Sequence, residues 1–428
     1  MDSLTHKQKK ALDYMLSGKN IFLTGPSGTG KSFIINTFKA LYSPTKNIAI
    51  TSTTGISALL IGGTTLHSYL GIGLGKGTPE ELASIIMGKR KARQRWQQLD
   101  CLVIDECSML GDLFDKLEET ARILMPKLGR ASLLKGNPLP FGGIQIILCG
   151  DFLQLPVVGS NNFCFEGKAW SKCIEHIVEL TDIIRQKDPD FQEVLNDLRY
   201  GNVTAKAKEL LLSRIGVELK NDLGIKPTRI HTTNDVVDQI NNKELEKLIE
   251  KVEQVYEYDM EVRFEDFVQD REGAIDKYRK SCPVPDKLKL CVGAQVMLMY
   301  NMDVEAGLAN GSRGVIIDFI EDKPFVKFLN GQEGVIDYYT WEIEEDKKKV
   351  AYISQVPLRL AWAITAHKSQ GATLDYAEVD LSNVFTHGQA YVALSRVKSK
   401  EGLKIISINF DTIRAHPKAV EFYKMVAE

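Results

Sequence analysis

The sequence lacks an excess of either charge, because 54 lysines and arginines stand against 56 aspartates and glutamates, for a formal net charge of −2. This balance excludes a protein that coats duplex DNA through a basic field over its whole surface, although it is compatible with a local basic groove. No apolar run approaches the roughly 18 residues of a membrane-spanning helix, so no membrane partner is predicted. The seven cysteines form no C-x-x-C pair and no Cys/His cluster with zinc-finger spacing, so we expect reduced thiols in the core.

Export and linker signals are also missing. The first residues contain no apolar stretch of the signal-peptide kind and no Arg/Ser-rich transit pattern, so we expect an intracellular protein. Its compartment would be the cytoplasm of a prokaryote or virus-infected cell, or the nucleus or mitochondrion of a eukaryote. No Pro-rich or Gly/Ser-rich linker and no repeat interrupts the chain. With 428 residues, 44% of them hydrophobic, the composition predicts a folded protein of about two to three domains.

Short apolar runs alternate with helical patterns up to about residue 180. The runs are rich in Ile, Val and Leu on both faces and lie at residues 21–24, 48–51, 102–104, 144–149 and 176–180. Because strands that are apolar on both faces are typical of a parallel sheet covered by helices, this part predicts a doubly wound α/β domain. Its ligand is expected at the carboxyl ends of the strands.

The same alternation resumes at residues 228–248 and again at 358–410, which predicts a second α/β domain. Five short strand-like runs between residues 292 and 356 interrupt it. Two pairs, Asn310-Gly311 and Asn330-Gly331, separate these runs with residues that tolerate the positive φ of tight hairpin turns. We therefore expect a small β-barrel inserted into the second α/β domain.

A phosphate-binding motif follows the first strand-like run. Residues Gly25-Pro26-Ser27-Gly28-Thr29-Gly30-Lys31-Ser32 fit G-x-x-x-x-G-K-[ST] between a strand and an amphipathic helix. The glycines let backbone N–H groups approach phosphate oxygens, Lys31 would reach the β- and γ-phosphates, and Ser32 would ligate Mg²⁺. The motif predicts ATP and Mg²⁺ as cofactors; the alternative is an ordinary Gly-rich turn.

Two further strand ends carry polar residues suited to hydrolysis. Asp105 and Glu106 follow an apolar run, so Asp105 is expected to hold Mg²⁺ and Glu106 to orient or deprotonate the attacking water. Gln154, in the segment GDFLQLP, is a candidate sensor of the γ-phosphate. A solvated Asp-Glu loop and a turn capped by Asp151 are the alternatives.

Two arginines are candidates for neutralising charge in the transition state. Arg185 lies in LTDIIRQ and Arg396 in YVALSR, and a guanidinium supplied across a cleft can stabilise a phosphoryl group in transfer. A single arginine is more often a surface residue, so these assignments depend on the resemblance below.

Three segments are candidates for nucleic-acid contact. Residues 89–95 contain five basic side chains, and Trp96 follows them, which suits either a solvated helix face or an insertion that contacts or splits a strand. The segments TTLHS (64–68) and TAHKSQG (365–371) offer hydroxyls and amides for phosphate contact without base readout. Polar capping and purely structural histidines at 67 and 367 are the alternatives.

Together these blocks resemble superfamily-one DNA helicases of the B branch, and within them the Pif (petite integration frequency) family. The resemblance spans nearly the whole chain, through residues 4–8, 25–32, 51–68, 103–109, 150–156, 180–186, 361–373 and 388–396. The most specific part is residues 112–118 followed by 140–145, which look like the family signature. The chain departs from the family pattern at Val157, where a second proline is usual, and in a longer segment at residues 126–139.

The resemblance implies a fold and a set of site residues. It implies two RecA-like domains, the first at residues 1–178 and the second at residues 179–290 and 358–428. The first would contain a wedge insertion at about 69–97. The second would contain an inserted SH3-like β-barrel at residues 291–357. Gln8 would read the adenine, and Gly371, Arg185 and Arg396 would join the P-loop in contacting the nucleotide. The implied DNA contacts are Thr54, Thr64, His67, Ser68, Trp96, Thr365, His367 and Lys368.

The implied activity is that of an ATP-dependent helicase. It would translocate 5′ to 3′ on single-stranded DNA, as a monomer, and unwind tailed duplexes, forks, G-quadruplexes or RNA–DNA hybrids, in replication, repair, recombination or telomere maintenance. Two alternatives stay open at the level of the sequence. One is a nucleotide-dependent translocase or binding switch that separates no strands, and the other is an RNA-directed helicase.

Overall fold

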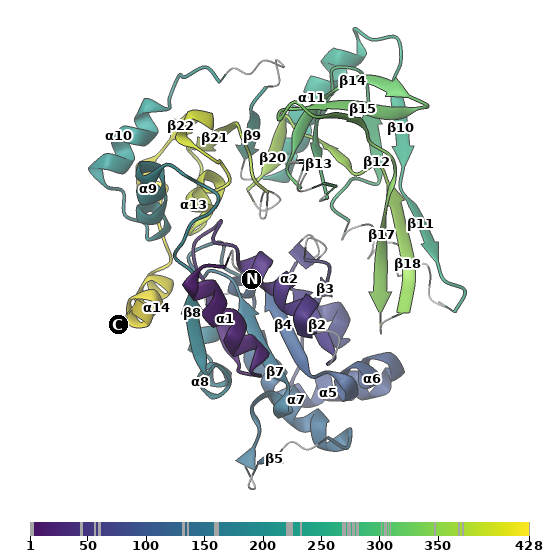
Figure 1. Ribbon diagram of the computed structural model, residues 1–428, viewed down its shortest axis with the longest axis vertical. Helices are drawn as coiled ribbons and strands as arrows, with labels where there is room; N and C mark the ends of the chain where they lie inside the picture. Colours follow the sequence, from purple (N-terminus) through teal and green to yellow (C-terminus); the bar gives the residue numbers. More distant parts are fainter. Residues whose placement is uncertain are drawn as a thin grey trace. The chain divides into compact units, whose positions relative to one another are not determined.

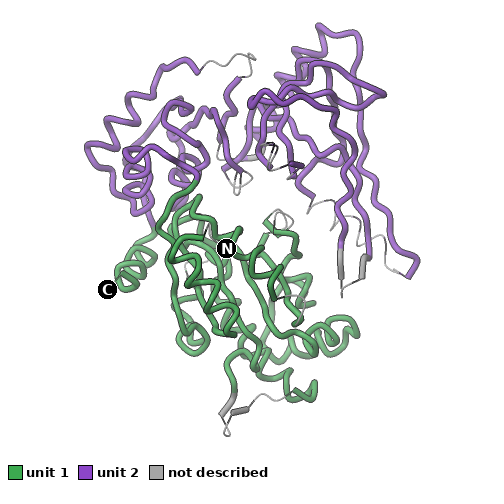
Figure 2. Tube along the Cα trace, in the orientation of Figure 1, with its two compact units in different colours: residues 1–184, 345–348, 416–428 green, residues 185–344, 349–415 purple. Residues whose placement is uncertain are grey.

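The computed structural model, drawn in Figure 1, describes most of the chain. The residues that it does not describe are 1–3, 43–45, 55–56, 59–60, 131–132, 135–136, 158–161, 220–225, 232, 268–270, 272–274, 276–278, 280–281, 301, 304–305, 307, 309, 346–347, 367–368, 370–371 and 428. The chain divides into two compact units, coloured separately in Figure 2. Unit 1 comprises residues 1–184, 345–348 and 416–428, and unit 2 comprises residues 185–344 and 349–415.

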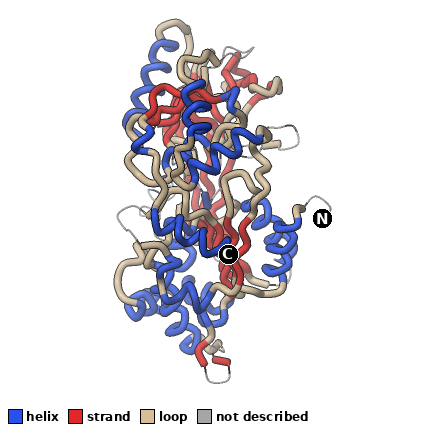
Figure 3. Tube along the Cα trace, turned by 90° about the vertical axis from the view of Figure 1, so that its left-hand side faces the viewer, coloured by secondary structure: helices blue, strands red, loops and turns tan. Residues whose placement is uncertain are grey.

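Unit 1 is built on a six-stranded parallel sheet with the strand order β3-β2-β4-β7-β1-β8. Its strands are β1 (Ile21–Thr24), β2 (Ile48–Ser52), β3 (Thr64–Thr65), β4 (Cys101–Asp105), β7 (Gln145–Cys149) and β8 (His176–Glu179). Every residue of β1, β4 and β7 is buried, so the predicted two-faced apolar strands form the centre of the sheet. Helices lie to either side of the strands in the view of Figure 3.

The described part of unit 1 contains eight α-helices. They are α1 (His6–Leu16), α2 (Lys31–Tyr42), α4 (Leu66–Leu70), α5 (Pro79–Gly88), α6 (Arg90–Gln98), α7 (Leu113–Lys127), α8 (Lys168–Cys173) and α14 (Pro417–Ala427). Thr5 and Gln8 form a reciprocal capping box at α1, and Thr78 and Glu81 form another at α5. Helices α5 and α6 occupy the predicted wedge insertion. A short pair, β5 (Leu133–Leu134) and β6 (Asn137–Pro138), follows α7.

Unit 2 contains a four-stranded parallel sheet with the order β20-β9-β21-β22. The strands are β9 (Thr228–His231), β20 (Ala363–Thr365), β21 (Ala377–Leu381) and β22 (Leu403–Ile408), and the helices are α9 (Pro189–Arg199), α10 (Ala205–Ser213), α11 (Asn234–Ile249) and α13 (Gln389–Leu394). Both units therefore have the parallel sheets typical of RecA-like domains, as predicted.

The β-rich insertion of unit 2 is antiparallel. Five strands pair in the order β16-β15-β14-β13-β19, three in the order β11-β18-β17, and β10 pairs with β12. Their bounds are β10 (Tyr256–Asp259), β11 (Glu261–Phe264), β12 (Lys287–Leu290), β13 (Gln295–Leu298), β14 (Arg313–Ile320), β15 (Lys323–Phe328), β16 (Glu333–Val335), β17 (Tyr339–Glu345), β18 (Lys348–Gln355) and β19 (Leu358–Leu360). Side chains of the five-stranded sheet and of the β10–β12 pair share one apolar core.

The turns of this insertion differ in part from the prediction. Asn330-Gly331 lies between β15 and β16 with φ of 85° at the glycine, as expected, but Asn310-Gly311 lies in the longer connection that precedes β14. The tight turn between β14 and β15 is made by Glu321 and Asp322, which have φ of 51° and 59°. Both central residues of a type I′ turn need positive φ, so these two side chains accept a conformation that the sequence did not signal.

The division into units also differs from the expected domain limits, at the C-terminus. Helix α14 groups with unit 1, whereas the expected second domain ran to residue 428. The physical reason is aromatic packing, because Phe422 stacks on Phe165 with centroids 4.4 Å apart and meets Phe152 and Trp170 edge-on. In the described part of the chain, no helix combines the length and the apolar character that crossing a membrane requires.

Candidate nucleotide and nucleic-acid sites

The P-loop lies at the carboxyl end of β1, the strand between β7 and β8. Gly25, Gly28 and Gly30 have φ of 137°, 83° and 86°, values that L side chains rarely adopt. A Cβ atom on Gly25 would collide with the Leu180 carbonyl oxygen. The Lys31 ammonium donates to the carbonyl oxygens of Gly25 and Pro26 at 2.7 and 2.9 Å, which holds it over the loop. The positive φ values thus give the loop before α2 a backbone conformation suited to phosphate binding at a helix N-terminus.

The acidic pair lies at the end of β4, two strands away in the same parallel sheet. Asp105 is buried, and this burial raises its pKa, while a hydrogen bond from Cys149 and the charge of Lys31 act in the opposite direction. Glu106 is partly exposed and has a φ of 54°, in the left-handed region. Its carbonyl oxygen accepts a 3.0 Å hydrogen bond from the Thr53 hydroxyl, which helps to hold the turn.

The turn after β7 carries Gln154 to the same edge of the sheet. Asp151 is fully buried, and its carboxylate accepts the backbone N–H of Leu153 at 3.1 Å and the Gln154 side-chain amide at 3.4 Å. The Gly150 N–H donates to the Leu23 carbonyl oxygen at 3.2 Å, so this turn is joined directly to β1. Because β4, β7 and β1 are parallel neighbours, the predicted residues Lys31, Asp105, Glu106 and Gln154 follow strands that end at one edge.

Gln8 is anchored beside the P-loop. Its side chain is 2% exposed, its Nε2 donates to the Thr29 carbonyl oxygen at 3.1 Å, and its Oε1 accepts the Thr5 N–H at 3.1 Å. A Cβ on Gly30 would come within 2.8 Å of the same Nε2. The glutamine thus connects the first helix to the loop, and adenine recognition by Gln8 stays a prediction.

The two predicted arginines lie close together in unit 2. Arg185 donates from Nη1 to the Ser395 carbonyl oxygen at 3.0 Å, and Arg396 donates from Nε to Val392 O and from Nη2 to the Ser395 hydroxyl, both at 2.9 Å. Burial and the neighbouring Arg396 charge lower the pKa of Arg185 to about 9, so it keeps its proton at neutral pH. The structure therefore places two cationic side chains, 211 positions apart in sequence, side by side.

The residues predicted to contact DNA differ in their burial and in their hydrogen bonds. Thr54 accepts the Ser57 N–H at 3.3 Å and caps a turn, and Thr64 has a buried hydroxyl without a hydrogen-bond partner. His67 and Ser68 are partly buried in α4, where burial lowers the pKa of His67. In unit 2, Thr365 is 3% exposed at the end of β20. His367, Lys368 and Gly371 lie outside the described residues.

Trp96 is not placed to stack on a base. Its side chain is fully buried in α6, and its indole Nε1–H donates to the Leu70 carbonyl oxygen at 3.0 Å. Arg95, from the same basic run, donates to the carbonyl oxygens of Ser68 and Tyr69 at 2.8 and 2.7 Å. The interpretation of Trp96 as a stacking platform is therefore wrong for this conformation: the residue fixes the insertion to α4.

Replacing Trp96 with Phe tests this correction. The exchange leaves the Leu70 carbonyl oxygen unpaired and shrinks a core side chain, so we expect the free energy of unfolding to fall by about 1–3 kcal/mol. The affinity for single-stranded DNA should be unchanged. Denaturant titration and fluorescence anisotropy measure the two quantities, and a loss of DNA affinity at unchanged stability would restore the stacking role.

Comparison with known proteins places these motifs in a family. A family model described as PIF1-like helicase matches residues 3–209, and one described as DNA helicase Pif1, 2B domain, matches residues 277–319. The uncharacterized protein 030L of Invertebrate iridescent virus 6 is 40% identical over 98% of this chain and 94% of its own length. The ATP-dependent DNA helicase PIF1 of Xenopus laevis is 40% identical over 98% of this chain, which spans 64% of that relative's length.

The chain belongs to the PIF1-like helicase family.

Solved Pif1 structures have the same architecture. The crystal structure of Pif1 helicase from Candida albicans is 36% identical, covers 100% of both chains and has a TM-score of 0.77. The crystal structure of Pif1 helicase from Bacteroides in complex with ADP-AlF3 and ssDNA is 29% identical, covers 99% of this chain and 97% of that one, and has a TM-score of 0.63. The resemblance of the motifs to the Pif family is thereby confirmed.

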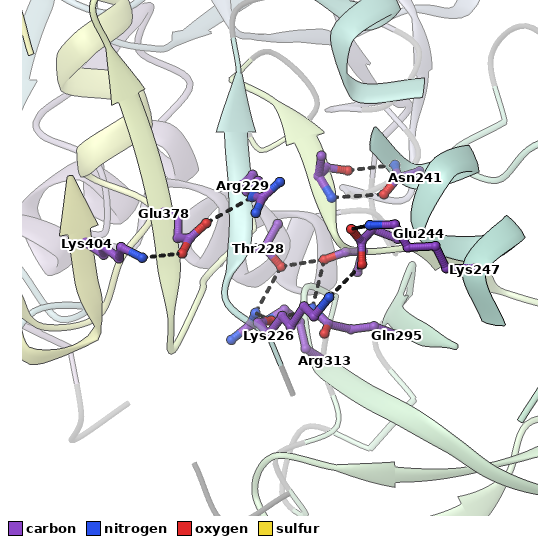
Figure 4. Close-up of polar contacts among 12 residues, drawn as sticks. Lys226, Thr228, Arg229, Asn241, Glu244, Lys247, Gln295, Arg313, Glu378 and Lys404 are labelled. Carbon is purple, nitrogen blue, oxygen red and sulfur yellow. Dashed lines mark hydrogen bonds and ion pairs between the residues drawn. The ribbon is translucent and has the colours of Figure 1, made fainter. Parts of the chain in front are cut away.

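In this Pif1-like chain, the insertion is joined to the parallel sheet of unit 2 by buried polar contacts, drawn in Figure 4. From β14, Arg313 donates to the Thr228 hydroxyl at 3.0 Å, and from β13, Gln295 donates to the Ala361 carbonyl oxygen at 3.2 Å. Thr228 is the first residue of β9, and Ala361 lies two residues before β20. Burial lowers the pKa of Arg313 to about 10.

The sequence motifs did not identify Asn241, whose side chain hydrogen-bonds to β20 in the parallel sheet of unit 2. Its side-chain amide donates to the Ala363 carbonyl oxygen and its Oδ1 accepts the Ala363 N–H, each at 2.9 Å (Figure 4). The side chain thus completes the hydrogen bonding of β20, the strand that leads to Thr365. No motif marks Asn241, because its partner lies 122 positions away.

Proposed function

We propose that this chain is an ATP-dependent DNA helicase that translocates 5′ to 3′ on single-stranded DNA and unwinds duplex or structured DNA. The observation that carries the proposal is the combination of a complete P-loop, acidic pair and Gln154 turn in unit 1 with the Arg185–Arg396 pair in unit 2. A protein that only switches between nucleotide-bound and nucleotide-free forms needs no second domain with such arginines. The Xenopus laevis relative and the Candida albicans structure are both named as helicases, which supports the motor over the switch.

The residues of the P-loop fit ATP and Mg²⁺. Positive-φ glycines leave room for phosphate oxygens, Lys31 supplies positive charge, and Ser32 and Asp105 supply hard oxygen ligands of the kind Mg²⁺ prefers. Mg²⁺ would neutralise charge on the β- and γ-phosphates. The described residues contain no cluster of three or more His, Cys, Asp or Glu, and a Mg²⁺ held largely by phosphate and water needs none.

The chemistry proposed for the protein's own groups is orientation and charge stabilisation. Glu106 accepts a proton from, or orients, the attacking water, and Gln154 contacts the γ-phosphate. Arg185 and Arg396 neutralise the charge that develops on the transferred group. We propose that these arginines bind ATP better than ADP and phosphate, so that hydrolysis weakens their hold on the nucleotide, which is the differential binding a motor requires.

For nucleic acid, we propose single-stranded DNA as the track. The Bacteroides relative was crystallised in complex with ADP-AlF3 and ssDNA. The contacts would be made by hydroxyls and backbone groups of Thr54, Thr64, His67, Ser68 and the segment from Thr365 to Lys368. Such contacts hold phosphates without reading sequence. We further propose that one chain suffices for translocation, in replication, repair, recombination or telomere maintenance.

Unwinding of a tailed duplex tests the proposal. One duplex carries a single-stranded tail on its 5′ or its 3′ end, and Lys31→Ala, which removes the phosphate-contacting ammonium, serves as the inactive control. We expect ATP-dependent unwinding from the 5′ tail and none from the 3′ tail. Unwinding from the 3′ tail would refute the polarity, and none from either tail would favour a translocase or switch.

The same assay with an RNA tail of matched sequence distinguishes the RNA-directed alternative. Phosphate contacts alone do not discriminate a 2′-hydroxyl, so salt must be held constant while the two tails are compared. We expect the DNA tail to support faster unwinding. A preference for RNA would transfer the activity to the alternative class while leaving the motor assignment intact.

A further inference from the structure

The C-terminal helix α14 is joined to the nucleotide-binding unit by contacts that the motifs do not explain. The chain leaves unit 2 at Ala415 and enters unit 1 at His416. On α14, the Lys418 ammonium pairs with Glu166 at 2.6 Å, and Phe422 packs among Phe152, Phe165 and Trp170. The next residue, Tyr423, is 1% exposed.

The Tyr423 hydroxyl connects the start of the P-loop with the turn that carries Gln154. It lies 2.5 Å from the Thr24 hydroxyl and accepts the Phe152 N–H at 3.3 Å. Thr24 immediately precedes Gly25, and Phe152 immediately follows Asp151, whose carboxylate holds Gln154. A single buried hydroxyl therefore bonds to both segments that are proposed to contact the γ-phosphate.

The residues around this hydroxyl are buried, so water could not replace it as a hydrogen-bond partner of Phe152. Thr24, Asp151 and Phe152 are each 0% exposed. Without the tyrosine oxygen, the Phe152 N–H would lose its acceptor in a site shielded from water, and a buried donor without a partner is costly. The turn would relieve that cost by shifting, and Gln154 would shift with it.

The residues just before α14 have a second attachment, within unit 2. The Arg414 carbonyl oxygen accepts the Gly388 N–H at 3.0 Å, and Gly388 is the N-cap of α13, the helix that leads to Arg396. Within unit 2, Arg414 is thus bonded to the N-cap of α13, and within unit 1, Tyr423 is bonded to Thr24 at the end of the P-loop strand.

We propose that Tyr423 is a positioning residue for ATP hydrolysis, which fixes the P-loop and the Gln154 turn relative to each other through its hydroxyl. The inference deepens the proposed function and rests on it, because the reaction measured is the ATP hydrolysis of that proposal. Tyr423 does not contact the nucleotide in this account. It acts through Thr24 and Phe152.

Tyr423→Phe removes only the hydroxyl and keeps the ring packed. We expect kcat for DNA-stimulated ATP hydrolysis to fall about tenfold, because Gln154 acts in the chemical step, while KM for ATP stays within about twofold because Lys31 and the glycine cradle are untouched. Thr24→Val, which removes the partner hydroxyl at similar volume, should lower kcat in the same direction but by less, because the Phe152 N–H keeps its acceptor, and Thr24→Ser should keep kcat near that of the unsubstituted chain. The double variant should be no worse than Tyr423→Phe, because the bond lost in Thr24→Val is one of the two that Tyr423→Phe removes.

Lys418→Ala provides the matched control. It removes an ion pair from the same helix without touching Thr24 or Phe152, so kcat should be unchanged. An unchanged kcat in Tyr423→Phe with a lowered Tm would overturn the inference and leave a purely structural tyrosine. An equal loss of kcat in Lys418→Ala would also overturn it, because docking of the helix would then explain the effect. If Tyr423→Phe does not fold, the Thr24→Val and Thr24→Ser pair decides in its place.

The unsubstituted chain separates failure of this inference from failure of the proposed function. If it hydrolyses no ATP with or without DNA, the proposed function is refuted and this inference with it. If it hydrolyses ATP normally and the hydroxyl variants match it, only the role of Tyr423 is refuted.

Discussion

Arg396→Ala is expected to lower ATP turnover by roughly 10³- to 10⁵-fold while leaving ATP binding measurable. The guanidinium is 2% exposed and held at Nε by the Val392 carbonyl oxygen and at Nη2 by the Ser395 hydroxyl. A charge fixed in this way needs no reorganisation when negative charge develops on the phosphoryl group, which is why the expected effect is large. Steady-state hydrolysis with single-stranded DNA and equilibrium binding of a fluorescent ATP analogue measure the two quantities.

Two matched variants accompany this measurement. Arg396→Lys keeps the charge but not the planar fork, and we expect it to recover only part of the activity. Arg214 has similar chemistry in the same unit, donating to the carbonyl oxygens of Leu403 and Glu401, so Arg214→Ala should turn over ATP normally. Normal turnover in Arg396→Ala would remove Arg396 from the hydrolysis site.

Glu106→Gln is expected to bind ATP and DNA but to hydrolyse ATP about 10²- to 10⁴-fold more slowly. The exchange keeps the shape of the side chain, and the backbone at φ 54° is held by the Thr53 hydroxyl, so the turn should survive. What is lost is the carboxylate that orients or deprotonates water. Single-turnover hydrolysis measures this step directly.

The control for this variant is Glu119→Gln, an exposed glutamate of α7 in the same unit. It makes the same chemical change away from the β4 edge, and its hydrolysis rate should match that of the unsubstituted chain. Near-normal hydrolysis by Glu106→Gln would show that another group serves as the base. Loss of ATP binding in Glu106→Gln would instead show that the turn had collapsed.

Much of the candidate site could be predicted as an arrangement of residues, because its signals are local in the sequence. The glycines of residues 25–30 need positive φ within one loop, and Asp105 and Glu106 directly follow a strand of buried residues. Parallel strands bring their carboxyl ends to one edge, so motif and strand together predicted which side chains would gather there. The same reasoning predicted an inserted β domain, since period-two alternation is also a local property. It placed the start of that domain at residue 291, whereas β10, β11 and β12, which precede residue 291, also pair in antiparallel fashion, β11 with β18.

The sequence by itself thus determined the α/β class, the P-loop and the family of this chain. Only the tertiary structure decided that Trp96 is a core residue, that α14 joins unit 1, and that Tyr423 bonds to Thr24 across 399 positions. Burial and hydrogen bonding of such side chains depend on partners that are distant in sequence. A periodic pattern specifies which face of a helix is apolar, but the residue that this face meets is set by the packing of the whole unit.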